Sequence, residues 1–250
     1  MPANPASSGA RKVDQQQIDY TGYSTSYDES RFEGLGNRYL EAVRCAAFSK
    51  VMGACDRGDV VLDVGCGTGR GLTYLHAEGF RRVVGVDFTP EMLTRAHAKS
   101  AVTSPRAATP LHGTTIFAHG DALALPVQSS SADLCTNAFG IRNVADRRAG
   151  IREMSRVLRP GGRVVILEFT MPPGRVLGAL YRFYFTRVLP LVGRIVSRDG
   201  EAYAYLPRTV LAWPSPTELQ RELEGEGLVE CGHQLLTRGI ACLHWGRVPA

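Results

Sequence analysis

The residues with the clearest capacity for chemistry form a glycine-dense segment after an apolar run. Residues 60–62 are apolar and lead into Asp63, and glycines then follow in the spacing GxGxG over residues 65–69. Glycine lacks a Cβ, so its backbone can adopt positive φ and approach a ligand closely. A second apolar run ends in Asp87, where an acid of a βαβ unit can bind a ribose diol. The pattern predicts a nucleoside site, with an ordinary tight turn as the alternative.

The spacing of the glycines indicates which nucleoside binds. A dinucleotide loop has the spacing GxGxxG and directs a helix amino terminus at a pyrophosphate, whereas this chain has GxGxG directly behind Asp63. A carboxylate at that place would repel a diphosphate, but it suits an ammonium group such as that of the methionine end of S-adenosylmethionine. With Asp63 leading and Asp87 following, the segment resembles motifs I and II of class I S-adenosylmethionine-dependent methyltransferases.

Two further groups are expected at the same place. Residues 115–118 form a third apolar run that leads to Asp121, an acid placed to accept a hydrogen bond from the adenine amine. Residues 134–138 form a fourth run, and Arg142 lies in the loop after it. Because ligands of such sheets bind outside the carboxyl ends of the strands, these features converge on one crevice. The residues expected to bind the cofactor, without any metal, are Asp63, Gly65, Cys66, Gly67, Thr68, Asp87, Phe88, Met92, Asp121, Ala122 and Asn137.

The elements that must position these residues alternate between strand and helix as far as residue 168. This alternation predicts an α/β fold with a doubly wound, mostly parallel, Rossmann-like sheet of seven strands and right-handed crossovers. Residues 159–162 are expected to turn into a fifth strand over residues 163–168. Residues 229–236 and 239–245 are predicted to form an antiparallel closing hairpin.

The chain divides into three segments by composition. Residues 1–17 are rich in Ala, Ser, Pro and Gln and are expected to be a disordered leader. Residues 18–56 contain closely spaced tyrosines and then a helical pattern, and are expected to form an amino-terminal lid and helix. Residues 57–250 form the expected methyltransferase domain, with an inserted helical cap at about residues 171–212. The alternative to a lid is a surface segment that packs on the domain by its rings.

Composition narrows the set of partners. The net charge of +5 is mild and the arginines are spread along the chain, so no nucleic-acid partner is expected. Six scattered cysteines without a CxxC pair indicate reduced thiols and a cytoplasmic location. Residues 172–196 combine aromatic and aliphatic side chains with spaced arginines. This segment is interpreted either as helices packed on the sheet or as a cap that also contacts a membrane surface, and a homodimer is a further option.

Several motifs outside the cofactor site belong together. They comprise residues 138–144, 152–154, 156–162, 167–170 with Pro172, 189–190, 203–206, and 239–240 with His244. With them the chain resembles the ubiquinone and menaquinone C-methyltransferase family from about residue 60 to its end. The resemblance implies S-adenosylmethionine as methyl donor, S-adenosylhomocysteine as product, and a small hydrophobic quinol as acceptor.

The amino-terminal region departs from that family. Of the family's YDxMN and His-Arg-x-Trp segments, only Tyr27, Asp28 and Arg38 remain in this chain. The departure affects the expected lid and therefore the acceptor, while the cofactor residues are intact. Methylation of another natural product at oxygen, nitrogen or carbon stays an alternative. A non-catalytic protein that binds adenosylmethionine is a third hypothesis, which the intact Asp87 and glycine segment disfavour.

The catalytic assignment centres on Arg142. A quinol ring carbon becomes nucleophilic when the adjacent hydroxyl group loses its proton, and Arg142 is expected to stabilise the resulting phenolate. A guanidinium stays protonated in proteins, so a water held by Arg142 and Asn143 is expected to remove the proton, and the resemblance implies the same pair. Tyr27 is expected to orient the acceptor from the lid. The alternative is that Arg142 merely pairs with a carboxylate, and Glu168 is the spare acid.

Overall fold

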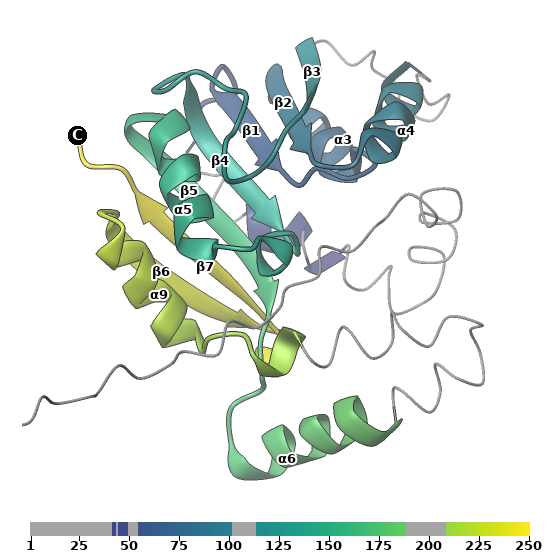
Figure 1. The fold of residues 1–250 in the computed structure, drawn as a ribbon, viewed down its shortest axis with the longest axis vertical. Helices are drawn as coiled ribbons and strands as arrows, with labels where there is room; N and C mark the ends of the chain where they lie inside the picture. Colours follow the sequence, from purple (N-terminus) through teal and green to yellow (C-terminus); the bar gives the residue numbers. More distant parts are fainter. Residues whose placement is uncertain (1–41, 44, 50–54, 102–113, 189–208) are drawn as a thin grey trace, which may run out of the picture.

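A seven-stranded sheet forms the centre of the protein (Figure 1). The computed structural model describes residues 42–43, 45–49, 55–101, 114–188 and 209–250. The strands are β1 (Val60–Val64), β2 (Arg82–Asp87), β3 (Thr114–His119), β4 (Ala132–Ala138), β5 (Leu158–Phe169), β6 (Val229–Leu236) and β7 (Ala241–Arg247). They lie in the order β3-β2-β1-β4-β5-β7-β6. The first five pair in parallel, whereas β7 is antiparallel to β5 and β6, which confirms the predicted α/β fold and closing hairpin.

Helices pack on both faces of the sheet. The main described helices are α3 (Arg70–Ala77), α4 (Pro90–Ala101), α5 (Arg147–Val157), α6 (Arg175–Phe183), which continues as the π-helix Tyr184–Val188, and α9 (Pro216–Gly225). Successive residues of β1 pack on opposite faces of the sheet. Val61 lies in one hydrophobic cluster with Leu72 of α3. Its neighbour Leu62 shares a second cluster with Ile151 of α5. This burial on two sides explains why the strands appear in the sequence as continuous apolar runs.

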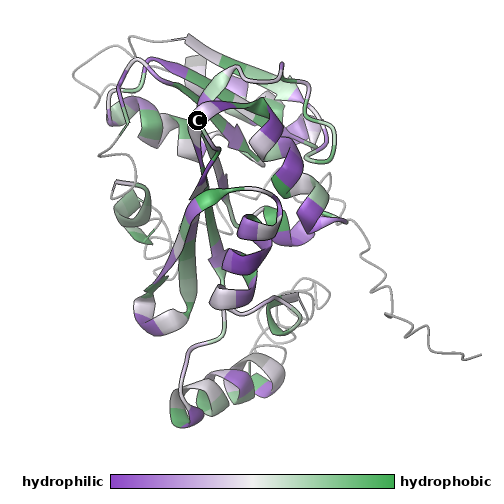
Figure 2. Cartoon of the chain, turned by 90° about the vertical axis from the view of Figure 1, so that its left-hand side faces the viewer, coloured by the Kyte–Doolittle hydropathy of each residue, from purple (hydrophilic) through white to green (hydrophobic). Residues whose placement is uncertain are grey.

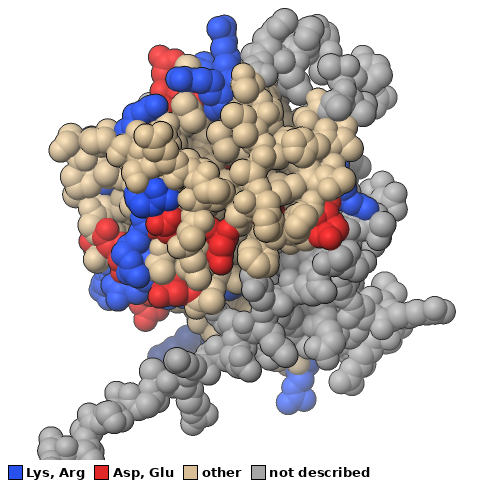
Figure 3. Space-filling view, turned by 45° about the horizontal axis from the view of Figure 1, so that its top comes forward, with Lys and Arg blue, Asp and Glu red and all other residues tan. Residues whose placement is uncertain are grey.

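The start of each helix on the α5 and α9 side is fixed by a capping residue. The Asp146 carboxylate accepts a hydrogen bond from the backbone N–H of Ala149, and Ser215 with Glu218 forms a reciprocal capping box at the start of α9. These helices carry hydrophilic residues on their outward sides (Figure 2). Acidic and basic side chains are interspersed on the face shown in Figure 3.

The start of β5 differs from the sequence prediction. β5 begins at Leu158, earlier than the expected residue 163. The expected turn at residues 159–162 is present as a bulge, because Ala132 pairs with Leu158 whereas Leu134 pairs with Arg163. The backbone N–H of Gly161 donates to Val248 O at 3.0 Å, and the N–H of Val248 donates to Gly162 O at 2.9 Å. Gly161 has a φ of 80°, so the segment turns as its Pro-Gly-Gly composition favours, while pairing with the carboxyl-terminal tail includes it in the strand.

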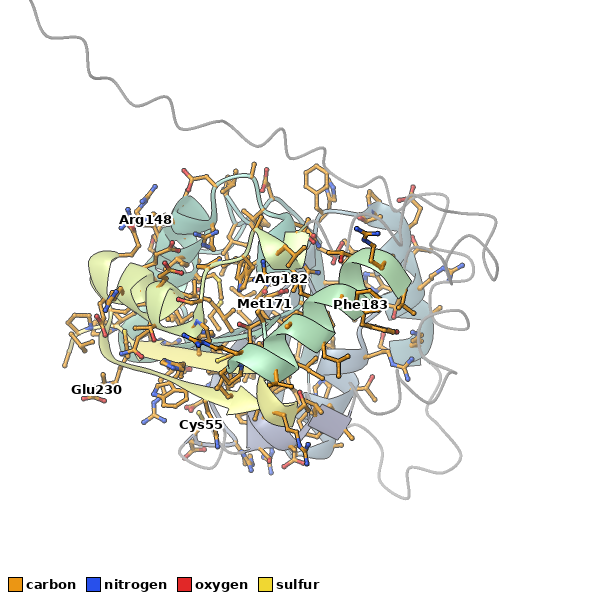
Figure 4. The ribbon with its side chains drawn as sticks, turned by 90° about the horizontal axis from the view of Figure 1, so that it is seen from below. Cys55, Arg148, Met171, Arg182, Phe183 and Glu230 are labelled. Atoms are coloured by element: carbon orange, nitrogen blue, oxygen red, sulfur yellow. The ribbon has the colours of Figure 1, made fainter. Side chains whose placement is uncertain are left out.

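Helix α6 lies at the carboxyl end of the parallel strands. It follows β5 and lies below the sheet in Figure 1, and Figure 4, seen from below, shows it in front of the sheet. The expected cap at about residues 171–212 contains this helix, but residues 189–208 lie outside the described part of the chain. The expected leader and nearly all of the expected lid also lie outside it. No helix among the described residues is long and apolar enough to cross a membrane.

Candidate active site

The glycine loop between β1 and α3 has the backbone conformation that its composition predicts. The φ angles of Gly65, Gly67 and Gly69 are 73°, 54° and 79°, in a region that residues with a Cβ rarely adopt. A Cβ on Gly67 would meet no atom within 4 Å, whereas one on Gly69 would lie 3.1 Å from the Cβ of Ala96. Gly67 therefore leaves room for a ligand, and Gly69 lets α4 approach the loop.

Asp87 at the end of β2 holds this loop in place. Its Oδ2 accepts a hydrogen bond from the N–H of Gly67 at 2.7 Å, and its Oδ1 accepts one from the N–H of Thr89 at 2.8 Å. The N–H of Gly65 donates to Val86 O at 2.7 Å. Burial raises the pKa of Asp87, and these two backbone donors act against that rise. Each carboxylate oxygen keeps a further lone pair, so the group can still accept from a ribose diol.

Asp63 is buried beside the loop at the end of β1. The hydroxyl of Thr136 on β4 donates to Asp63 Oδ1 at 2.7 Å, an interaction that the sequence did not indicate. Burial, followed by the charges of Asp63 and Asp87, raises the pKa of the Cys66 thiol. Cys66 is therefore an uncharged part of the loop wall, and the site holds two carboxylates that suit a cationic ligand.

The ends of β2 and β3 bring the expected adenosine contacts together. Asp87 and His119 are register partners across these two strands, and His119 Nε2 lies 2.9 Å from Phe88 O. The ring of Phe88 is exposed. Asp121 follows β3, and its Oδ1 accepts from the N–H of Leu123 at 2.9 Å. An exposed ring next to Asp87 in the chain fits a nucleoside. Of the other expected contacts, Met92 is buried in the first turn of α4, and Ala122 is half-buried in the turn after β3.

Asn137 connects β1 with the loop that carries Arg142. Its Nδ2 donates to Val64 O at 2.7 Å, and its Oδ1 accepts from the N–H of Ile141 at 2.8 Å. The side chain is 2% exposed. The structure thus gives Asn137 a role in shaping the site, in addition to the cofactor contact expected from the sequence.

Arg142 lies in the 3-10 turn Ile141–Asn143 after β4 and forms a buried ion pair with Glu168 of β5. Arg142 Nη1 lies 3.1 Å from Glu168 Oε2, and the side chains are 5% and 0% exposed. The guanidinium carbon is 5.4 Å from the centre of the Phe169 ring, which packs 4.5 Å from the ring of Phe139. Burial raises the pKa of Glu168, while Arg142 and the N–H of Phe169 lower it. The carboxylate pairing considered as the alternative for Arg142 is therefore present.

The structure shows fewer contacts for the other two predicted catalytic residues, Asn143 and Tyr27. Asn143 ends the same 3-10 turn, and its N–H donates to Gly140 O at 3.0 Å. Tyr27 lies outside the described residues. Tyr181 of α6 is a residue that sequence reasoning missed: its hydroxyl has a pKa raised by burial and by Tyr184, with Arg142 acting in the opposite direction. Its only signal in the sequence was the aromatic character of the segment after Pro172.

Comparison with known sequences extends this description. The family model described as the ubiE/COQ5 methyltransferase family matches residues 44–248. A demethylmenaquinone methyltransferase of Thermus thermophilus is 41% identical over 192 residues, which are 76% of this chain and 82% of that protein. The ubiquinone/menaquinone biosynthesis C-methyltransferase of Geobacter sulfurreducens is 39% identical over 216 residues, 85% of this chain and 79% of that protein.

Solved structures share the fold at low sequence identity. A phosphoethanolamine N-methyltransferase of Haemonchus contortus, in complex with phosphomonomethylethanolamine and S-adenosylhomocysteine, aligns with a TM-score of 0.65 and 15% identity over 95% of this chain and 59% of that one. A SAM-dependent methyltransferase from Methanosarcina mazei aligns with a TM-score of 0.56 and 20% identity over 80% and 97% of the two chains. These likenesses establish the class I methyltransferase fold.

The first prediction concerns the role of Asp87 in ligand binding. Replacing Asp87 with Ala removes the acceptor for the ribose diol and the anchor of Gly67, so we expect S-adenosylhomocysteine to bind at least about 100-fold more weakly, because hydrogen bonds to a charged group contribute about 1.5–3 kcal/mol each. Isothermal titration calorimetry measures this loss. Glu91→Ala, which removes a nearby carboxylate from the first turn of α4, serves as the control and should bind normally. Unchanged affinity of the Asp87 variant would show that the ligand does not bind at this loop.

The raised pKa of Asp87 predicts a pH dependence of binding. The diol donates to the ionised carboxylate, so affinity is full above the pKa of Asp87 and falls as pH decreases through it. Because burial raises this pKa, the decrease should begin at a higher pH than the ordinary aspartate value of about 3.9 allows. Calorimetry over a pH series tests this, with Asp87→Asn as a variant that should lack the transition. A transition of equal position in that variant would assign it to another group.

Proposed function

Because the chain belongs to the ubiE/COQ5 methyltransferase family, we propose that its methyl acceptor is the ring carbon of a quinol in quinone biosynthesis. The protein is an S-adenosylmethionine-dependent methyltransferase, and this cofactor supplies a methyl group on an electrophilic sulfonium. The relatives with matching regions are named for demethylmenaquinone and for ubiquinone/menaquinone C-methylation. The observation that supports a phenolic acceptor most directly is the buried guanidinium of Arg142 beside aromatic rings.

The chain's own residues divide the donor site into three parts. The glycine loop and Asp63 are proposed to hold the methionine portion, because the backbone there is open and the carboxylate suits an ammonium group. Asp87 is proposed to accept from the ribose, and Phe88 with Asp121 to bind the adenine. All of these groups lie at the carboxyl ends of β1, β2 and β3, whereas Arg142 and Glu168 follow from β4 and β5.

Arg142 is proposed to stabilise the negative charge that develops on the acceptor oxygen. Its Nη1 is engaged by Glu168, and its Nε has no hydrogen-bond partner among the described residues although it is buried. In a planar guanidinium the Nε–H points along a different edge from Nη1, so Arg142 can bind Glu168 and a phenolate at the same time. The rings of Phe169 and Phe139 provide an apolar wall against which an aromatic acceptor can stack.

Quinol methylation is favoured over methylation of an unrelated natural product. The relatives named for quinone methylation share 39–41% identity over 76–85% of this chain, whereas the N-methyltransferase of solved structure shares only 15%. Asn143 remains the proposed partner of Arg142 in holding a water. Tyr27 remains a predicted acceptor contact from the amino-terminal segment.

Replacing Arg142 with Lys tests the role of its planar guanidinium. Lysine keeps the charge that Glu168 needs but loses the Nε edge. We expect turnover of a reduced demethylmenaquinone analogue to fall by about 10²-fold to 10³-fold, as is typical when one transition-state donor is lost, with unchanged affinity for S-adenosylhomocysteine. Arg152→Lys, at an exposed ion pair with Glu226, is the control. Full turnover in the Arg142 variant would show that this side chain does not bind the reacting oxygen.

We also propose that α6 contacts an anionic membrane surface. Val176, Leu180 and Phe183, spaced at i, i+4 and i+7, are 83%, 63% and 58% exposed. Residues 171–188 include Arg175, Arg182 and Arg187 but no acidic residue. An exposed apolar stripe flanked by arginines suits the interface of anionic lipids. Arg182 and Phe183 are labelled on this helix in Figure 4.

Sedimentation with vesicles tests this membrane contact. Wild-type protein should sediment with vesicles that contain phosphatidylglycerol and much less with neutral ones, because both the apolar stripe and the arginines contribute. Replacing Leu180 with Ser should lower this binding severalfold. Leu235→Ser, which changes an exposed leucine of β6, should not. If wild-type protein does not sediment with vesicles, the stripe does not bind a membrane. If Leu180→Ser changes a dimer into a monomer by light scattering, the stripe is instead an interface with a second copy of the chain.

A further inference from the structure

The ion pair of Arg142 with Glu168 has more hydrogen-bonding capacity than the fold uses. Arg142 Nε–H and Glu168 Oε1 are both buried and have no hydrogen-bond partner among the described residues. Glu168 Oε2, by contrast, accepts from Arg142 Nη1 and from the N–H of Phe169, each at 3.1 Å. Burying a donor and an acceptor without hydrogen-bond partners lowers the stability of the fold. A ligand group that both donates and accepts could provide the missing hydrogen bonds to both atoms.

A hydroxyl group is the ligand group that matches this pair. It donates one hydrogen bond and accepts others, so its proton can face Glu168 Oε1 while its oxygen accepts from Arg142 Nε–H. A ketone or an ether could accept but would leave the carboxylate oxygen unsatisfied.

We propose that Glu168, in place of the water expected between Arg142 and Asn143, is the general base that removes the proton from the acceptor's hydroxyl group. This inference rests on the proposed quinol acceptor and deepens it, because it assigns the proton to a residue of the chain. The acceptor O–H bond breaks as an O–H bond forms on Oε1, and the resulting phenolate is held by Arg142. A carbon–carbon bond then forms between the ring and the methyl group as the sulfur–methyl bond breaks. Glu168 returns its proton to the oxygen as the ring carbon loses its hydrogen to solvent, so one proton is released overall.

The surroundings of Glu168 are suited to this role. Burial raises the pKa of its carboxyl, as a base that must take a proton from a phenol requires, and the adjacent charge of Arg142 acts in the opposite direction by favouring the carboxylate. The neighbouring titratable groups add no opposing charge at neutral pH. On β7, the register partner Cys242 has a thiol pKa raised to about 12 by burial. On α6, burial raises the pKa of Tyr181, so both groups stay neutral.

Glu168→Gln is the direct test, since glutamine keeps the shape and can still accept from Arg142. We expect kcat for the reduced demethylmenaquinone analogue to fall by about 10²-fold to 10⁴-fold, the usual contribution of a general base, with unchanged affinity for S-adenosylhomocysteine. The acidic limb of the kcat profile against pH, where protonated Glu168 is inactive in wild type, should disappear. The matched control is Glu222→Gln, which neutralises the acid of the Arg147 ion pair outside the site and should leave kcat and its pH profile unchanged.

Rescue separates a base from a structural residue. An acceptor analogue with a more acidic hydroxyl needs less help to ionise, so it should restore much of the turnover in Glu168→Gln but not in Arg142→Lys. A Glu168→Gln variant with wild-type kcat and an intact acidic limb would overturn the proposal. So would a folded variant that no acidic analogue rescues, because Glu168 would then only position Arg142.

A measurement on wild-type protein keeps the test valid if Glu168→Gln does not fold. The acidic limb belongs to Glu168 under this proposal, so its position should stay constant when acceptors of different hydroxyl acidity are compared. A limb that moves with the acidity of the acceptor would assign the titration to the acceptor and overturn the role of Glu168. Wild-type protein that methylates no quinol would instead refute the proposed function itself, which distinguishes the two failures.

Discussion

The donor site depends on the contact between one carboxylate and the backbone of the glycine loop. Asp87 accepts from Gly67 and from Thr89, so it fixes the turn after β1 against the turn after β2. A loop in which every second residue is a positive-φ glycine has large conformational freedom, and ordering it costs entropy. The same carboxylate that offsets this cost is the group expected to grip the ribose, which couples the order of the loop to the binding of its ligand.

The acceptor side shows a different compromise. A buried ion pair is weak evidence for stability, because desolvation of both charges offsets their attraction, and each unsatisfied buried polar atom costs about 1–3 kcal/mol. Apolar residues of similar volume in place of a buried ion pair are often neutral or stabilising. The fold carries this cost because its two hydrophobic clusters, one on each face of the sheet, supply ample burial. Natural proteins commonly retain such a destabilising feature where activity needs it, which is consistent with the proposed roles of Arg142 and Glu168.

The sequence was sufficient to predict where in the fold the candidate site residues lie when their position is local or set by topology. The glycine loop, Asp87 and the strand that leads to Asp121 follow from short motifs and from the rule that ligands bind at the carboxyl ends of parallel strands. The partners of the buried polar groups could not be predicted from local sequence patterns, because the paired residues are far apart in the chain. Thr136 and Asp63 are 73 residues apart, and Arg142 and Glu168 are 26 apart. The early start of β5 was missed because it depends on pairing of Gly161 and Gly162 with Val248, a residue at the far end of the chain.

The two halves of the site are joined by Asn137. Its amide donates to Val64 at the end of β1 and accepts from Ile141, the residue before Arg142, so one rigid side chain connects the donor strand to the turn that carries the guanidinium. A Cβ at Gly140 would lie only 2.7 Å from this amide, which explains why glycine follows Phe139 there. Methyl transfer needs the nucleophile aligned closely with the methyl carbon and sulfur. A buried hydrogen-bond bridge between adjacent parallel strands can hold that alignment, because it leaves the turn with Arg142 little freedom to move relative to the glycine loop.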